Sequence, residues 1–169
     1  TAEIAIHAAL TGHLVFATLH TNDAPGAVVR LINMGVEPFL ISSALLGVIG
    51  QRLVRTVCPH CRKEAEMDKK VLRRLSSNNN DLTHYYYGEG CPKCLNSGYR
   101  GRKGIYELMV MDEEMRKIVL EQQSGDILRE RARKTGMKTL REMGIEKIRE
   151  GLTTPEEVLR VTQETEEGA

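Results

Sequence analysis

The sequence has 169 residues, 41% hydrophobic and 4% aromatic, with 24 Lys and Arg against 23 Asp and Glu, and four cysteines. This length fits one domain, or one domain and a small module, and is enough to bury a sizeable core. A formal net charge of +1 excludes a chain that binds nucleic acid or anionic lipid as a polycation. The longest strongly apolar stretch, 39–50, has about twelve residues, whereas a membrane-spanning helix needs about twenty, so we expect no transmembrane segment.

Charge divides the chain into three segments. Residues 1–50 carry one basic and three acidic residues, giving −2. Residues 51–104 carry twelve basic against five acidic residues, giving +7, and hold all four cysteines. Residues 105–169 carry eleven against fifteen, giving −4. The near-neutral total therefore conceals a basic module between two acidic parts.

The first fifty residues follow a helix–strand–helix pattern. Apolar residues at helical spacing predict a helix over 1–10 that ends near Gly12. Residues 13–20 are almost continuously apolar, rich in β-branched and aromatic side chains and too short for a helix, which is typical of a central parallel strand. Residues 21–23 offer N-caps for a helix with Pro25 in its first turn. This order predicts an α/β sheet.

The rest of the chain is predicted to form further helices with one short strand. Pro38 begins a helix through about Gly50, and residues 51–57 alternate as a strand. Residues 76–80 form a polar loop. Helices are expected over 112–122, from 124 or 126 to 134, over 138–150, and from a Thr-Pro-Glu-Glu capping box at 154–157.

Four cysteines form two pairs with the same Cys-Pro-x-Cys spacing, Cys58 with Cys61 and Cys91 with Cys94, separated by twenty-nine residues. Each pair turns two thiolates toward one point, and two pairs supply the four ligands of a tetrahedral ion, for which Zn²⁺ is the usual occupant. Two disulfides are the alternative, which a chain without a secretory signal disfavours. Four thiolates leave no position for water, so the site is expected to be structural.

A Zn²⁺ ion with four thiolates carries a formal charge of −2, and Arg62, Lys63 and Lys93 are near enough in sequence to offset it. His60 lies between two ligands and is an alternative ligand, although four thiolates already close the site. Residues 84–87 are expected to form a strand, and the alternation of its tyrosines leaves a base-stacking surface for nucleic acid open.

His13 and His20 flank the predicted strand and would point to opposite faces of it. His20 lies at the carboxyl end of the strand, just before a helix, where open α/β sheets bind ligands. A structural histidine is the plain alternative on spacing alone. Further along, residues 97–104 contain three glycines and the cations Arg100, Arg102 and Lys103, which describes a tight loop suited to phosphate or to a carboxylate-rich neighbour. A solvated basic loop explains the same residues equally well.

Together these motifs resemble one family closely. Residues 11–23 (TGHLVFATLHTND) are similar to the histidine box of the secretion ATPases. Residues 38–43 (PFLISS), 51–55 (QRLVR), the cysteine pairs, 98–108 (GYRGRKGIYEL) and 151–160 (GLTTPEEVLR) follow in that family's order. The chain thus resembles the hexameric P-loop ATPases of type II secretion and type IV pilus assembly. The related pilus-retraction ATPases share the histidine box but, as a family, lack the tetracysteine module.

The resemblance implies an α/β fold, the C-terminal part of a RecA-like P-loop ATPase domain with an inserted tetracysteine zinc module and a helical C-terminal tail. Residues 1–57 would be the C-terminal part of the ATPase core, 58–104 the zinc module and 105–169 the helical subdomain. In this family the P-loop, the acidic box and Walker B precede the histidine box, and neither GxxxxGKS nor GxxxxGKT occurs here. We therefore expect a fragment whose upstream part is missing.

For the complete protein, the resemblance implies ATP hydrolysis with Mg²⁺ by a homo-hexamer. His20 would act near the γ-phosphate as a sensor or polarising group, with His13 as a supporting residue. Arg102, and less strongly Arg100, would reach the nucleotide or an adjacent subunit. The expected partners are the inner-membrane platform and cytoplasmic-domain proteins of a secretion or pilus machine, which would hold a cytoplasmic protein at the inner membrane. No nucleic acid is expected, and the fragment alone should be inactive.

Two other functions fit parts of the sequence. The +7 segment and the tyrosines fit a nucleic-acid-binding zinc module attached to a motor. The cysteine pairs alone fit a structural, metal-stabilised adaptor with no role in ATP turnover.

Overall fold

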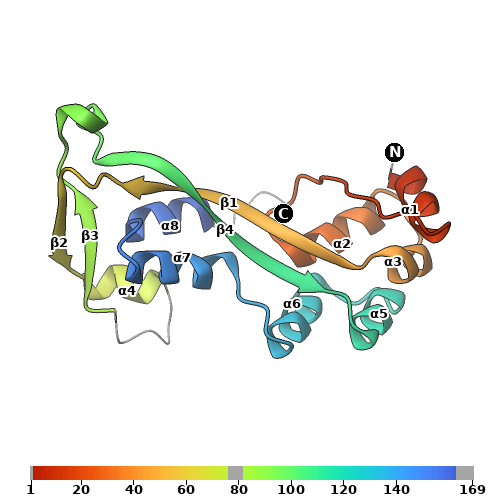
Figure 1. Ribbon diagram of the computed structural model, residues 1–169. Coiled ribbons are helices and arrows are strands. Elements are labelled where there is room, and N and C mark those ends of the chain that lie inside the picture. The colour runs from red at the N-terminus through yellow and green to blue at the C-terminus, as the bar shows by residue number, and fades with distance from the viewer. Residues whose placement is uncertain (1, 76–81, 163–169) are drawn as a thin grey trace. The chain divides into compact units, whose positions relative to one another are not determined.

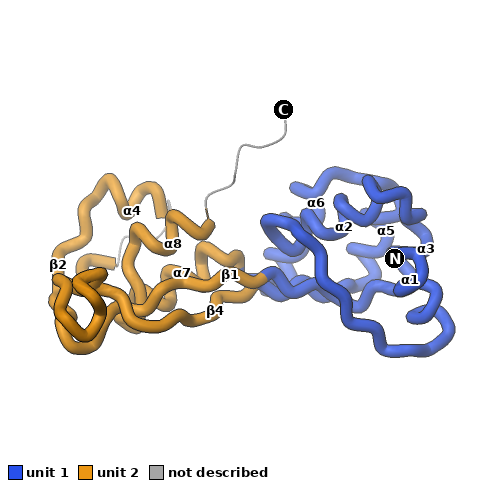
Figure 2. The backbone as a smooth tube through the Cα atoms, turned by 90° about the horizontal axis from the view of Figure 1, so that it is seen from above, with its two compact units in different colours: residues 1–50, 107–138 blue, residues 51–106, 139–169 orange. Residues whose placement is uncertain are grey.

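The computed structural model describes residues 2–75 and 82–162 (Figure 1). The loop predicted at 76–80 lies outside the described residues. The chain forms two compact units, unit 1 with residues 1–50 and 107–138 and unit 2 with residues 51–106 and 139–169 (Figure 2). The bounds of these units differ from those of the predicted segments 1–57, 58–104 and 105–169. The functional division into those segments stays a prediction.

Two strands contribute residues to both units. β1 (Gly47–Val57) and β4 (Tyr99–Val110) pair as a two-stranded sheet and run in opposite directions (Figure 1). β2 (Arg62–Glu66) and β3 (His84–Gly88) form a second, antiparallel pair in unit 2. The tyrosines predicted to lie on a strand are thus on β3.

Unit 1 is largely helical. Its helices are α1 (Ala2–Leu10), α2 (Ala24–Asn33), α3 (Pro38–Ala44), α5 (Glu113–Leu120) and α6 (Gly125–Lys134). Aspartates begin two of them as the sequence predicted, because Asp23 and Asp112 each accept a hydrogen bond from a backbone N–H of the first turn at 2.8 Å. The core of the unit consists of apolar side chains from α2, α3, β4, α5 and α6, among them Val28, Ile41, Met109, Met115 and Leu128.

The strand predicted at 13–20 is wrong. The segment has no helix or strand, and its large apolar side chains face solvent, with Leu14 71% and Phe16 89% exposed. A strand is stable only when its backbone N–H and C=O groups pair with a neighbour. Neither of the two sheets formed by the described residues includes this segment. The predicted central parallel strand is therefore not formed.

The helix predicted from Pro38 to Gly50 ends earlier, at Ala44, and β1 begins at Gly47 rather than at residue 51. A Cβ on Gly47 would lie 2.9 Å from the Met109 carbonyl oxygen. The pairing with β4 thus brings the two backbones together where the sequence favoured a helix. Tertiary pairing overrides local preference here.

In the described part of unit 2, three α-helices pack with the strands. They are α4 (Lys69–Leu75), α7 (Leu140–Arg149) and α8 (Pro155–Thr162). The core of the unit includes Val54, Ile105, Ile145, Ile148 and Val158.

The helices predicted in the last third of the chain, over 112–122, up to 134, over 138–150 and from 155, are all confirmed to within a few residues.

A buried carboxylate fixes α8 to β1. Glu157 is 1% exposed, and its oxygens accept hydrogen bonds from the Arg55 backbone N–H at 3.0 Å, from the Arg55 guanidinium at 2.8 and 3.0 Å, and from Arg160 at 2.7 and 3.0 Å. Burial raises the pKa of Glu157, but these hydrogen bonds outweigh it and lower the pKa to about 2. The predicted capping box is only half formed. Thr154 Oγ1 accepts from the Glu157 N–H at 3.3 Å, whereas the Glu157 side chain bonds the arginines instead.

We predict that Glu157→Gln lowers the free energy of unfolding of unit 2 by about 2 kcal/mol at neutral pH, because one buried oxygen becomes an NH₂ group facing two guanidinium groups. All five tyrosines lie in unit 2 and the chain has no tryptophan, so tyrosine fluorescence during urea unfolding reports this unit alone. Glu156→Gln removes the same charge from an exposed neighbour and serves as the control. Equal effects of the two substitutions would contradict the role of Glu157.

The native protein and the Glu157→Gln variant also allow a test by pH. The folded-state pKa of Glu157 lies below its ordinary value of 4.5, so its contribution is present in full above 4.5 and is lost as the pH falls toward about 2. The stability difference between the native protein and Glu157→Gln should therefore shrink over that range. A difference that is constant with pH would show that the carboxylate charge is not the stabilising group.

Candidate metal centre and histidine segment

The four cysteine sulfurs converge on one point. All lie within 4.8 Å of one another, and the Sγ atoms are 3.9 Å apart for Cys58 and Cys91, 3.9 Å for Cys61 and Cys94, and 3.7 Å for Cys91 and Cys94. A tetrahedral zinc site with Zn–S bonds of about 2.3 Å places its sulfurs about 3.8 Å apart. The cysteines are free thiols rather than disulfides. The donor set thus fits a tetrahedral metal ion.

Strand ends and close glycine contacts assemble this centre. Cys58 follows β1, Cys61 precedes β2, and Cys91 and Cys94 lie between β3 and β4 in and next to a 3₁₀ turn, Pro92–Cys94. A Cβ on Gly88 would lie 2.0 Å from the Gly98 carbonyl oxygen, so only glycine fits there. The Cys58 N–H donates to that same carbonyl at 2.9 Å, which joins the first turn to the second.

Backbone N–H groups donate hydrogen bonds to two of the sulfurs. Gly90 N–H donates to Cys61 Sγ at 3.3 Å, and Cys91 N–H donates to Cys94 Sγ at 3.2 Å. Desolvation raises the pKa of the Cys94 thiol, but hydrogen bonds from the N–H groups of Cys91 and Gly98 outweigh it and lower the pKa to about 6. Desolvation raises the pKa of Cys61 to about 12. A divalent cation would therefore be needed to hold the Cys61 side chain as a thiolate.

The cations expected to offset the thiolates have other partners. Arg62 lies over the Tyr86 ring at 3.6 Å, and Lys63 pairs with Glu89 at 2.7 Å. The cluster of possible metal ligands contains the four cysteines without His60. His60 as a competing ligand thus finds no support in the geometry.

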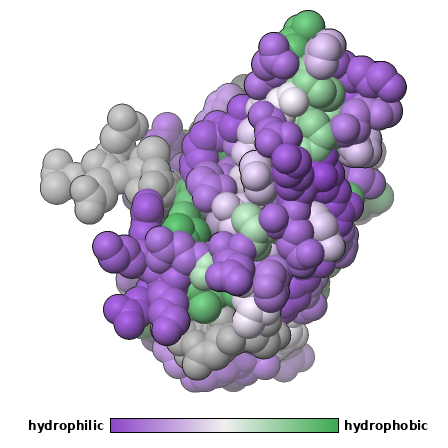
Figure 3. Space-filling model, turned by 90° about the vertical axis from the view of Figure 1, so that its left-hand side faces the viewer, coloured by the Kyte–Doolittle hydropathy of each residue, from purple (hydrophilic) through white to green (hydrophobic). Residues whose placement is uncertain are grey.

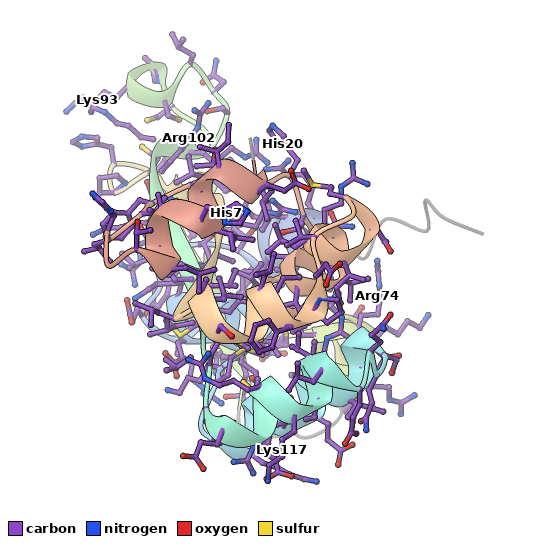
Figure 4. All side chains as sticks on the ribbon, turned by 90° about the vertical axis from the view of Figure 1, so that its right-hand side faces the viewer. His7, His20, Arg74, Lys93, Arg102 and Lys117 are labelled. Carbon is purple, nitrogen blue, oxygen red and sulfur yellow. The ribbon has the colours of Figure 1, made fainter. Side chains whose placement is uncertain are left out.

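The predicted histidines lie in the exposed segment of unit 1. His20 is exposed (Figure 4). His13 is exposed too, and its Nδ1 lies 3.1 Å from Thr11 Oγ1. His20 directly precedes the turn into α2, where Thr21 Oγ1 donates to the Asp23 carbonyl at 3.1 Å. Their expected opposite orientation on a strand does not apply, since no strand forms.

Sequence reasoning missed two residues that hold this turn. Glu107 on β4 is buried, and its carboxylate accepts a hydrogen bond from the Ala24 N–H at the start of α2. Arg129 on α6 forms an ion pair with Asp23. One signal in the sequence marked Glu107. It takes the position between Ile105 and Met109 in a strand whose alternate residues face inward.

The predicted basic loop at 97–104 is mostly the first part of β4, which begins at Tyr99. Gly101 adopts φ +89°, so the strand is locally irregular, and the Arg100 carbonyl accepts a hydrogen bond from Thr56 Oγ1. Arg102 lines a surface cavity of about 550 Å³ together with Arg55, Ser97, Tyr99 and Gly101. Arg100 instead extends toward His60, with Nη1 at 3.3 Å from Nε2.

Comparison with known proteins places the chain in a family. The model of the type II/IV secretion system protein family matches residues 1–160. The chain is 53% identical to the type IV pilus assembly ATPase PilB of Thermus thermophilus, over 97% of this chain and 19% of that protein. It is 48% identical to the type II secretion system ATPase E of Vibrio cholerae, over 98% of this chain and 33% of that protein.

The fold is similar to a solved structure of the pilus retraction motor PilT with bound ADP, with a TM-score of 0.61 and 23% identity over 98% of this chain and 37% of that one. This likeness shows the mixed α/β fold alone. The chain spans a third or less of the two relatives described above. No helix among the described residues is long and apolar enough to cross a membrane. Because the family model covers nearly the whole sequence, the chain belongs to the family of type II/IV secretion system proteins.

Proposed function

We propose that this chain is the C-terminal portion of a hexameric ATPase that couples ATP hydrolysis to type II protein secretion or to type IV pilus assembly. The observation that carries the proposal is the high identity, over almost all of this chain, to two ATPases named for those processes. Because the relatives include both a secretion and a pilus protein, the proposal covers the shared motor activity and not one cargo. Its partners would be the inner-membrane platform and cytoplasmic-domain proteins, which would hold it at the cytoplasmic side of that membrane.

We assign residues 13–20, which we call the histidine segment, to nucleotide sensing in the complete protein. Phosphoryl transfer depends on positioning and on neutralising the charge of the phosphates. His20 is exposed and follows a segment without internal pairing, so its ring is available to a ligand. The buried Glu107 and the Arg129–Asp23 pair hold the first turn of α2 immediately after it. His13 would support the segment, and Arg102 and Arg100 would reach the nucleotide or an adjacent subunit.

ATP and Mg²⁺ are the cofactors of the proposed activity. In P-loop ATPases the Walker A backbone and lysine cradle the phosphates, and Mg²⁺ is held by the P-loop hydroxyl and a Walker B carboxylate. The present sequence has no GxxxxGKS or GxxxxGKT. The residues here therefore supply only part of a nucleotide site.

We assign Zn²⁺ to the cysteine centre as a structural ion. Four thiolates close the coordination sphere, which leaves no position for a reacting water. Such an ion can supply on the order of 10 kcal/mol of folding free energy, which suits a module with few large apolar residues. The ion would fix the two cysteine turns at the ends of β1, β2, β3 and β4.

This chain alone should neither bind ATP tightly nor hydrolyse it, because the groups that cradle the phosphates are lacking in its sequence. The measurement is phosphate release by the purified chain beside a complete protein of the family. Turnover by the chain alone at a rate near that of the complete protein would contradict the proposal.

In the complete protein, His20→Ala should reduce the ATPase rate by about a hundredfold while the circular dichroism spectrum stays unchanged, since one polarising contact to the phosphates is lost. His7→Ala, which removes another exposed histidine of unit 1, is the matched control and should keep the native rate (Figure 4). An unchanged rate for His20→Ala would make this histidine structural and would favour the adaptor function instead.

Protein purified without chelators should contain one zinc ion per chain by elemental analysis. Cys91→Ser should lower the zinc content and the unfolding midpoint of unit 2, and acidification should release the ion as the thiolates are protonated. Leu95→Ala, at a position of the same turn that is 90% exposed, should change neither quantity. A zinc content far below one per chain in the native protein would refute the assignment.

A further inference from the structure

Three basic side chains meet beside the cysteine centre, and His60 lies far from the other two in sequence. His60 lies in the first cysteine turn, Lys93 in the second, and Arg100 at the start of β4. The His60 ring lies between the other two, with Lys93 Nζ 3.5 Å from Nδ1 and Arg100 Nη1 3.3 Å from Nε2. Lys93 and its surroundings are exposed (Figure 4). We call these residues the basic triad.

The ring of His60 cannot satisfy both cations. A neutral imidazole has one nitrogen that accepts a hydrogen bond and one that donates, and the ammonium and guanidinium groups only donate. One of the two contacts therefore sets a donor against a donor. The arrangement has more N–H donors than acceptors, which an anion placed among the three groups would correct.

No acidic residue fills this role. Among the residues that the structure describes, no carboxylate forms a hydrogen bond or ion pair with His60, Lys93 or Arg100. The other cations of the turns differ, since Lys63 is paired with Glu89 and Arg62 is stacked on Tyr86. Hydrophilic side chains cover most of the side of the molecule that Figure 3 shows, the side of β2.

Charge compensation of the metal centre explains the triad less well. Among the described residues, the N–H groups that donate to the sulfurs belong to the backbone, such as those of Gly90 and Cys91, and none belongs to the triad. Lys93 and Arg100 are directed at the imidazole of His60 instead. An ammonium has three N–H donors and a guanidinium has five, so further donors of Lys93 and Arg100 remain for a ligand from solution.

We propose that His60, Lys93 and Arg100 form a binding site for a phosphate group. An imidazole, an ammonium and a guanidinium come from three chain segments, and the two cations lie at the two nitrogens of the ring. A phosphate monoester presents three acceptor oxygens to such a group of donors, whereas a carboxylate presents two. Arg100 is shared with the proposed function, which places it near the nucleotide or an adjacent subunit, whereas His60 and Lys93 have no part in it. Loss of phosphate binding in Lys93→Gln therefore tests the site separately from the ATPase assignment.

The test is titration of the zinc-loaded protein with inorganic phosphate, followed by the NMR signals of the His60 ring. Saturable shifts are expected in the native protein. Lys93→Gln and Arg100→Gln should each weaken phosphate binding about tenfold, since each removes a charged hydrogen bond, whereas Lys93→Arg should retain most of it. Lys63→Gln removes one positive charge from the same module outside the triad and should bind phosphate as the native protein does.

A second arm identifies the source of the phosphate. Vesicles of phosphatidylcholine with phosphatidic acid, compared with phosphatidylcholine alone, present the same monoester on a lipid surface. Triad-dependent binding to the acidic vesicles would assign the site to a lipid headgroup, and binding of inorganic phosphate alone would assign it to a soluble phosphate.

Two outcomes would overturn the proposal. The first is the absence of saturable binding to either probe in the native protein, whatever the variants do. The second is equal weakening by Lys63→Gln and Lys93→Gln, which would show a diffuse attraction to the basic module. Zinc content measured on every variant ensures that lost binding is not lost folding.

Discussion

The strands β1 and β4 pair with each other, and together they contribute residues to both hydrophobic cores. In unit 1, Met109 of β4 packs with the helices, and in unit 2, Val54 of β1 and Ile105 of β4 lie among α7 and α8. The close approach of Gly47 to the Met109 carbonyl requires a residue without a side chain there. Any change that separated these strands would therefore expose apolar surface in both units.

The same pairing positions the cysteine centre, because β1 leads into the first cysteine turn and β4 leaves the second. The Cys58 N–H bonds the Gly98 carbonyl just beyond the ends of these strands. A bound metal ion would hold the two cysteine turns together just beyond the point where the hydrogen bonds between β1 and β4 end. The module can thus remain ordered with polar, charged strands such as β2, whose side chains are mostly exposed.

Local chemistry in the sequence predicted the features that depend on a few neighbouring residues. The spacing within each cysteine pair and the aspartate caps of α2 and α5 are of this kind, since the groups concerned are within four residues of one another. The strand at 13–20 failed because a strand depends on partners elsewhere in the chain. The basic triad and the contact of Glu107 with Ala24 were equally invisible, because each joins residues far apart in sequence.

Two buried carboxylates illustrate why such distant contacts matter for function. Glu107 in unit 1 and Glu157 in unit 2 are the buried carboxylates among the described residues, and each links a strand to the beginning of a helix. A buried charge without partners is costly, so each carboxylate strongly favours the geometry that supplies its donors. In unit 2 this geometry fixes α8. In unit 1 it fixes the first turn of α2, and with it the point where the exposed histidine segment enters the folded core.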